Sequence, residues 1–118
     1  NQVKAAVRYE ELLREKQELD FEAIVLESLK IIREQPRVRD LINCKFPWLV
    51  IDEYQDLGGP LHQIVGLLSG NGSAKVFAVG DPDQTIHTFN GADPKYLGEL
   101  TGAKTFKTVR LKFNYRSG

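Results

Sequence analysis

The sequence predicts an α/β fold in which helices cover a small parallel sheet, with two or three further helices before the sheet. Two short, mostly apolar runs, residues 48–51 and 75–79, are separated by a helical pattern of about ten residues. Strand, helix and strand at this spacing indicate a βαβ unit, whose strands are parallel. The first run has no polar residue, which is typical of a strand buried on both faces in a three-layer domain.

Three helices are predicted before the first strand. In residues 2–16 apolar side chains recur at helical spacing among charged ones. Asp20 is suited to cap a second helix, which Pro36 ends, and residues 37–44 predict a short third helix. The apolar stripe of the second helix is predicted to consist of Phe21, Ile24, Val25, Ser28 and Ile32.

Further elements follow the first strand. Pro60 is placed to open a helix that the Gly-rich residues 70–73 end, and the second strand begins directly afterwards. A short helix is predicted over residues 94–100, and the alternation in residues 108–111 predicts a third strand. The apolar stripe of the helix between the first two strands is predicted to be Leu61, Ile64, Val65 and Leu68.

Composition limits the classes of protein that fit. The 118 residues suit one domain or a piece of a larger one, and 16 basic residues balance 16 acidic ones, unlike an independent DNA-binding domain. The single cysteine, Cys44, excludes an internal disulfide framework and is interpreted as a small apolar residue. No apolar run is long enough to cross a bilayer and no signal peptide is recognisable, so we expect a cytoplasmic protein with no membrane contact.

Polar residues follow both predicted strands. Asp52 and Glu53 come directly after the first strand, and Asp83 and Gln84 lie in the loop after the second. The carboxyl ends of parallel strands share one edge of a sheet, where open α/β sheets bind their ligands. Two carboxylates there suit a hydrated Mg²⁺ ion and an attacking water. The alternative from these residues alone is that the acids only begin a turn.

Three separated segments resemble motifs of the UvrD/Rep/PcrA family of superfamily 1 DNA helicases. Residues 50–56 (Val-Ile-Asp-Glu-Tyr-Gln-Asp) match the Walker B motif, residues 79–86 with Gly91-Ala92 match the third motif, and residues 114–117 (Asn-Tyr-Arg-Ser) match the fourth. The resemblance implies part of a RecA-like domain of the P-loop NTPase type. It also implies that residues 1–18 are the helical tail of an inserted subdomain and that residues 19–118 belong to the first motor domain.

The resemblance also implies roles for single residues. Asp52 matches the acid that holds Mg²⁺, and Glu53 matches the acid that activates water beside that ion. Gln84 and Arg116 match residues that contact the γ-phosphate of ATP, and Tyr115 matches the aromatic residue that stacks on adenine.

His87 and Phe89 match residues that stack on bases of single-stranded DNA, a contact that tolerates any sequence. Without the motif, Phe89 and Tyr115 would be core aromatics, and His87 and Arg116 ordinary solvated side chains. The family usually has tyrosine in place of His87 and arginine in place of Asn90. Histidine can still stack, whereas Asn90 removes a cation near the acidic site.

The resemblance implies a fragment of an ATP-dependent 3′-to-5′ DNA helicase or translocase, with ATP and Mg²⁺ as cofactors. Its partners would be single-stranded DNA and the remaining helicase domains of the same protein. The sequence has no Gly-x-x-x-x-Gly-Lys-Ser/Thr phosphate loop, so we expect the isolated chain to be inactive. The alternatives are a non-catalytic helicase-like module that binds DNA or protein, and an unrelated Walker-type ATPase, which would not explain residues 114–117.

Overall fold

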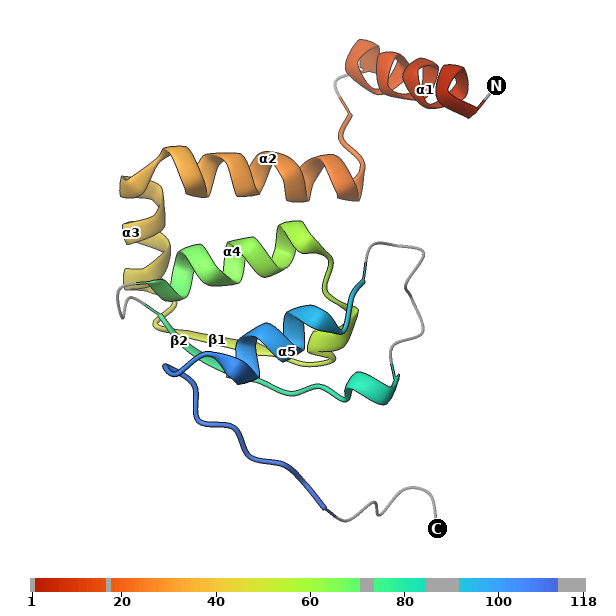
Figure 1. Ribbon diagram of the computed structural model, residues 1–118. Coiled ribbons are helices and arrows are strands. Elements are labelled where there is room, and N and C mark those ends of the chain that lie inside the picture. The colour runs from red at the N-terminus through yellow and green to blue at the C-terminus, as the bar shows by residue number, and fades with distance from the viewer. Residues whose placement is uncertain (1, 17, 71–73, 85–91, 113–118) are drawn as a thin grey trace. The chain divides into compact units, whose positions relative to one another are not determined.

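A computed structural model describes residues 2–16, 18–70, 74–84 and 92–112 of the chain (Figure 1). These residues form five α-helices and a parallel sheet of two strands, and the predicted α/β fold class is confirmed. No helix among them is long and apolar enough to span a membrane. The elements are α1 (Gln2–Lys16), α2 (Phe21–Glu34), α3 (Pro36–Lys45), β1 (Trp48–Ile51), η1 (Tyr54–Asp56), α4 (Gly59–Ser69), β2 (Lys75–Ala78), η3 (Pro82–Gln84) and α5 (Lys95–Gly102), where η marks a 3₁₀-helix.

The chain divides into two compact units. The first contains Asn1–Val50 and Pro60–Phe77, and the second contains Ile51–Gly59 and Ala78–Gly118. Each strand therefore begins in the first unit and ends in the second.

The first unit contains the predicted cap and stop of α2. The Asp20 carboxylate accepts a hydrogen bond from the Ala23 backbone N–H at 2.8 Å, as predicted for an N-cap. The helix ends at Glu34, and α3 begins with Pro36, whose ring is compatible with the first turn of a helix. The predicted boundaries of α1, α2 and α3 agree with the structure to within one or two residues.

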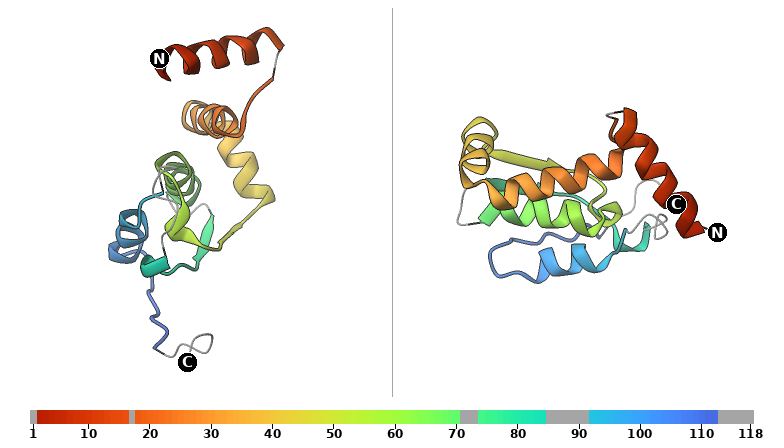
Figure 2. Two further views of the ribbon diagram at one scale, coloured as in Figure 1. Left: turned by 90° about the vertical axis from the view of Figure 1, so that its right-hand side faces the viewer. Right: turned by 90° about the horizontal axis from the view of Figure 1, so that it is seen from above.

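The buried face of α2 differs from the predicted stripe. Leu29 and Ile32 are its buried residues, whereas Phe21 is 75% exposed and Ile24 is 49% exposed. The predicted stripe was therefore wrong at its first two positions and omitted Leu29. The contacts of α2 explain the difference, because its C-terminal half packs against α3 and lies beside α4 (Figures 1 and 2). There the Arg33 guanidinium donates a hydrogen bond of 2.5 Å to the side-chain carbonyl of Gln63 on α4.

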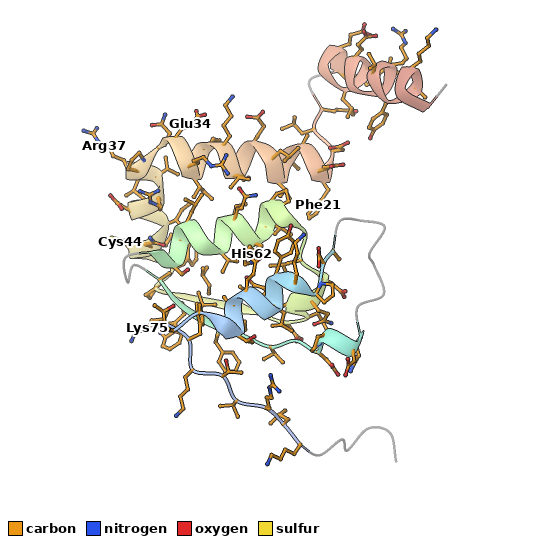
Figure 3. The ribbon with its side chains drawn as sticks, in the orientation of Figure 1. Phe21, Glu34, Arg37, Cys44, His62 and Lys75 are labelled. Carbon is orange, nitrogen blue, oxygen red and sulfur yellow. The ribbon has the colours of Figure 1, made fainter. Side chains whose placement is uncertain are left out.

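Helix α4 supplies most of the remaining core of the first unit. Val65 and Leu68 are buried, in agreement with the predicted stripe, and Ala74 is buried directly before β2. The Ala74 N–H donates to the Leu68 carbonyl at 3.1 Å, which joins the start of β2 to the end of α4. Figure 3 labels Phe21 and Glu34 near the two ends of α2, and Cys44 on α3. Cys44 is exposed, contrary to the expectation of a buried apolar residue.

The two strands are parallel, as predicted. The Lys75 N–H donates to the Pro47 carbonyl at 2.9 Å, and the Val79 N–H donates to the Ile51 carbonyl at 2.9 Å. Both hydrogen bonds join residues at the same separation in sequence, which is the register of a parallel pair. The βαβ unit inferred from the spacing is therefore present, with α4 as its helix.

One face of the sheet is not covered, which corrects the prediction that β1 is buried on both faces. In this register Trp48 lies opposite Lys75 and Val50 lies opposite Phe77. Trp48 is 56% exposed, Val50 is 73% exposed and Phe77 is 56% exposed. Lysine covers part of the tryptophan, since the Lys75 Nζ lies 5.1 Å from the centre of the Trp48 ring. Among the described residues nothing else packs on this apolar face to bury it.

The second unit contains the strand ends and α5. Helix α5 packs against η1, and an antiparallel bridge joins Gly58 to Ala92. The third strand predicted over residues 108–111 is absent, which is a correction. Val109 is 73% exposed and Leu111 is 89% exposed. An alternating pattern forms a strand only where an open sheet edge receives its N–H and C=O groups, and no described strand pairs with this segment.

Candidate functional site

The two polar segments predicted after the strands lie at the same edge of the sheet. Element η1 follows β1 and η3 follows β2, at the right-hand end of both strands in Figure 1. Two hydrogen bonds hold the segments together, since the Val79 N–H donates to the Ile51 carbonyl at 2.9 Å and the Tyr54 N–H donates to the Val79 carbonyl at 2.9 Å. The shared edge expected of parallel strands is therefore confirmed.

Glu53 has an unusual backbone conformation. Its φ of 52° and ψ of 45° place it in the left-handed region, and no other non-glycine residue in the described ranges has a positive φ. Such a conformation costs about 1–3 kcal/mol and occurs where surrounding structure imposes it. The Asp52 carboxylate accepts a hydrogen bond from the Glu53 N–H at 2.9 Å, and the Asp56 N–H donates to the Glu53 carbonyl at 2.9 Å. These two bonds hold the turn that directs Glu53 away from the strand.

Gln55 is the buried polar residue of the site. Its side chain is 1% exposed, yet both ends of its amide are hydrogen-bonded. The Nε2 atom donates to the Glu53 Oε2 atom at 2.7 Å, and the Oε1 atom accepts from the Asp81 backbone N–H at 3.0 Å. The Gln55 side chain therefore connects the acidic end of β1 to the loop that follows β2.

Asp81 continues this connection to Gln84. The Asp81 carboxylate accepts from the Gln84 side-chain amide at 2.8 Å and from the Asp83 backbone N–H at 3.0 Å. A continuous series of hydrogen bonds thus runs from Glu53 through Gln55 and Asp81 to Gln84. We call these four residues the relay.

Hydrogen bonds connect all four of the acids and amides that were grouped from the sequence, namely Asp52, Glu53, Asp83 and Gln84. Asp52 bonds to the Glu53 backbone, and Asp83 reaches the relay through its own backbone N–H. Sequence reasoning missed Gln55 and Asp81, which join the two segments. Each of the two is a polar residue close to the predicted site residues of its motif, and this was the available signal. The sequence does not show that the Gln55 side chain and the Asp81 backbone are hydrogen-bonded to each other.

Packing beneath the relay is tight. Tyr54 is fully buried, and burial, with the nearby charge of Glu99, raises the pKa of its phenol above the ordinary value of 10.0. Gly80 has no room for a side chain, because a Cβ atom there would lie 2.8 Å from the Gln55 Oε1 atom and 3.2 Å from the Tyr54 backbone nitrogen. The glycine therefore lets the loop after β2 approach η1 closely.

The acids at the strand end fit Mg²⁺ only as part of a larger set of ligands. The described residues contain no group of three or more side chains that could hold a metal ion together. Mg²⁺ is commonly bound through one or two carboxylates, with waters and substrate phosphates as its other ligands. Asp52 and Glu53 are exposed, and the hydrogen bonds described above engage one oxygen of each carboxylate. They can therefore supply such a pair.

Four of the residues assigned a role from the resemblance lie outside the described residues. They are His87, Phe89, Tyr115 and Arg116, and Asn90 lies there as well. Their assignments stay predictions. Of the described ones, Asp52, Glu53 and Gln84 are all exposed at the same edge of the sheet.

The sequence is similar to a family of DNA helicases. The family model described as the UvrD/REP helicase N-terminal domain matches residues 1–104. The chain is 35% identical over 100 residues to the ATP-dependent DNA helicase Rep of Escherichia coli, which covers 84% of this chain and 15% of that protein. It is 31% identical over 110 residues to the ATP-dependent DNA helicase PcrA of Staphylococcus epidermidis, covering 92% of this chain and 15% of that protein. A putative ATP-dependent DNA helicase of Bacillus subtilis, YjcD, is 29% identical over 113 residues, or 92% of this chain and 14% of its own length.

Proposed function

Because the chain belongs to the UvrD/Rep helicase family, we propose that it is part of an ATP-dependent DNA helicase that moves 3′-to-5′ on single-stranded DNA. The chain spans about one seventh of the length of the relatives it matches, so the activity would belong to a longer protein. Within that protein, residues 1–18 would be the tail of an inserted helical subdomain, and residues 19–118 would belong to the first motor domain.

The observation that carries the proposal is the relay at the carboxyl edge of the sheet. It connects Glu53, at the end of one strand, to Gln84, after the next strand, through two intervening hydrogen-bonded side chains. Through such a connection, a residue that contacts the γ-phosphate could affect the position of a residue that acts on the attacking water. Both proposed groups are exposed, so a nucleotide can reach them.

Each residue of the site has a proposed chemical role. Asp52 would hold Mg²⁺, which supplies charge neutralisation on the phosphate oxygens when it is bound. Glu53 would accept a proton from the attacking water, and Gln84 would donate a hydrogen bond to a γ-phosphate oxygen or to that water. Arg116 would bind the γ-phosphate through its planar guanidinium, and Tyr115 would stack on adenine.

Single-stranded DNA is the proposed second ligand. His87 and Phe89 would stack on its bases, and they follow Gln84 closely in the chain, so a displacement of Gln84 would be passed to them directly. The balanced net charge of the chain is compatible with this contact, because stacking on bases by aromatic side chains does not require an excess of basic residues. Basic side chains that hold the phosphate backbone would come from the remaining domains.

The test uses the full-length protein that carries this chain, with DNA-stimulated ATP hydrolysis as the readout. Glu53→Gln keeps the shape of the side chain but cannot accept a proton, so we expect turnover to fall by about 10²–10⁴-fold. Binding of ATP, measured by fluorescence of a labelled analogue, is expected to change little. Glu27→Gln is the matched control, since Glu27 is exposed on α2, and it is expected to retain full activity.

Two outcomes would contradict the proposal. Turnover by Glu53→Gln equal to that of the unmodified protein would remove Glu53 from its role as base. A full-length protein that binds single-stranded DNA without hydrolysing ATP would instead favour the non-catalytic module.

A further inference from the structure

Gln55 has no role in the proposed chemistry, although it is the most buried polar side chain of the site. We propose that Gln55 is a positioning residue, which holds the Glu53 carboxylate in place and couples it to the loop formed by residues 80–84. This inference rests on the proposed function of Glu53 and adds a residue that does not itself touch nucleotide or water.

The hydrogen-bond partners of Gln55 require an amide. The Glu53 carboxylate, 2.7 Å from Nε2, accepts hydrogen bonds, whereas the Asp81 backbone N–H, 3.0 Å from Oε1, can only donate. A side chain in this place must therefore donate at one end and accept at the other. An ionised glutamate could satisfy Asp81 but not Glu53, and a methionine of similar length could satisfy neither.

Burial of Gln55 makes the loss of its hydrogen bonds to Glu53 and Asp81 costly. Gln55 is 1% exposed, so water cannot replace a lost partner readily. Glu53 is exposed and lies in a left-handed turn, and the Gln55 amide donates a hydrogen bond to its carboxylate. Without that bond the carboxylate would sample several rotamers, and fewer of them would place it against the attacking water.

The same amide connects Glu53 to the proposed phosphate-sensing residue. The Asp81 N–H donates to Gln55, and the Asp81 carboxylate accepts from the Gln84 amide at 2.8 Å, so hydrogen bonds join Gln84 to Glu53 through Asp81 and Gln55. Gly80 lies directly against Gln55, because a Cβ there would approach Oε1 to 2.8 Å. A movement of the loop would therefore displace the Gln55 amide and the carboxylate that it holds.

The test measures ATP hydrolysis by three variants of the full-length protein. Gln55→Glu removes the bond to Glu53 and keeps the bond to Asp81, whereas Gln55→Met removes both. We expect Gln55→Glu to lower kcat by about 10–100-fold, the usual effect of losing a group that orients a reacting one, with KM for ATP changed by less than about threefold. Gln63→Glu, an exposed glutamine on α4, is the matched control and is expected to leave kcat unchanged.

A double variant separates positioning from mere stability. In Glu53→Gln combined with Gln55→Glu, the donor and acceptor are exchanged and the hydrogen bond can form again. We expect its melting temperature to recover relative to Gln55→Glu alone, while ATP hydrolysis stays as low as in Glu53→Gln. If instead Gln55→Glu lowers kcat, ATP affinity and melting temperature together, and the exchange restores none of them, Gln55 is only a core residue and the inference is wrong.

The failure of this inference is distinguishable from failure of the proposed function. Normal kcat in Gln55→Glu and Gln55→Met, in a protein that Glu53→Gln inactivates, would overturn the role of Gln55 alone. Normal kcat in Glu53→Gln would overturn the proposed function, and the role of Gln55 with it.

Discussion

At the residue scale, the site depends on the close approach of Gly80 to Gln55 and on the strained backbone turn at Glu53. Glu53 adopts a left-handed conformation that an L-residue avoids unless its neighbours impose it, and the bonds from Asp52 and Asp56 impose it here. Gly80 allows the loop after β2 to pass within contact of the Gln55 side chain. A residue with a strained backbone at a strand end is typical of a functional position.

Gly80→Ala is predicted to disturb the relay. The added Cβ would lie 2.8 Å from Gln55 Oε1 and 3.2 Å from the Tyr54 nitrogen, so backbone and amide must both shift. We expect a loss of about 1–3 kcal/mol in the free energy of unfolding, typical of overpacking, and a lower kcat for ATP. Urea denaturation and ATPase assays on the full-length protein measure the two effects.

Gly66→Ala is the control for this prediction. Gly66 lies within α4, and an added Cβ there would have nothing within 4 Å. Alanine is the better helix former, so we expect this variant to gain roughly 0.5–1 kcal/mol and to keep its ATPase activity. Equal behaviour of the two variants would show that the space around Gly80 does not constrain the site.

At the element scale, local signals determine where the helices begin and end. The carboxylate of Asp20 satisfies the Ala23 N–H at the start of α2, and Pro36 starts α3 where α2 has ended. Helix α2 in turn positions α3 and lies beside α4, which is the helix of the βαβ unit. The limits of these helices of the first unit are therefore locally encoded.

Asp20→Ala is predicted to destabilise the protein by about 1 kcal/mol, within a range of roughly 0.5–2, through loss of the N-cap. Asp20→Asn is expected to restore most of this loss, because an amide oxygen can also accept from Ala23. Asp40→Ala, an exposed acid on α3, controls for removal of a charge. Chemical denaturation compares the three, and an Asp20→Ala variant as stable as the Asp40→Ala control would argue against the cap.

At the scale of the whole molecule, the residues that the structure describes leave one face of the sheet uncovered. Trp48, Val50 and Phe77 are each more than half exposed, although their composition predicted burial. In the helicase proposed here, further parts of the motor domain would cover this face and complete the nucleotide site. The phosphate loop is the part whose absence from this sequence bears most directly on activity, because its backbone N–H groups and lysine bind the β- and γ-phosphates.

The 118-residue chain is therefore predicted not to hydrolyse ATP by itself. Purified chain, with and without single-stranded DNA, is expected to turn over ATP no faster than its Glu53→Ala variant. Isothermal titration is expected to detect no tight binding of ATP. DNA-stimulated turnover above the Glu53→Ala background would contradict this prediction and would require the phosphates to be bound by residues present here.

The sequence by itself determined the five α-helices, the first two strands and their order. The apolar periodicity of α4, the apolar run of β1, the cap at Asp20 and the break at Pro36 are local signals, since each acts within a few residues through sterics or a single hydrogen bond. The βαβ spacing then placed Asp52 and Gln84 at one edge of the sheet, because parallel strands leave no other arrangement.

Only the tertiary structure decided which surfaces are covered and which side chains meet. The alternation at residues 108–111 predicted a strand, but pairing depends on a free edge elsewhere, and the exposed face of β1 depends on what packs over it. The contact between Gln55 and Asp81 joins residues 26 positions apart, so no local pattern encodes it. Burial and hydrogen-bond partners are properties of neighbours distant in sequence, and for this reason the residue that connects the two halves of the site became visible only in the folded chain.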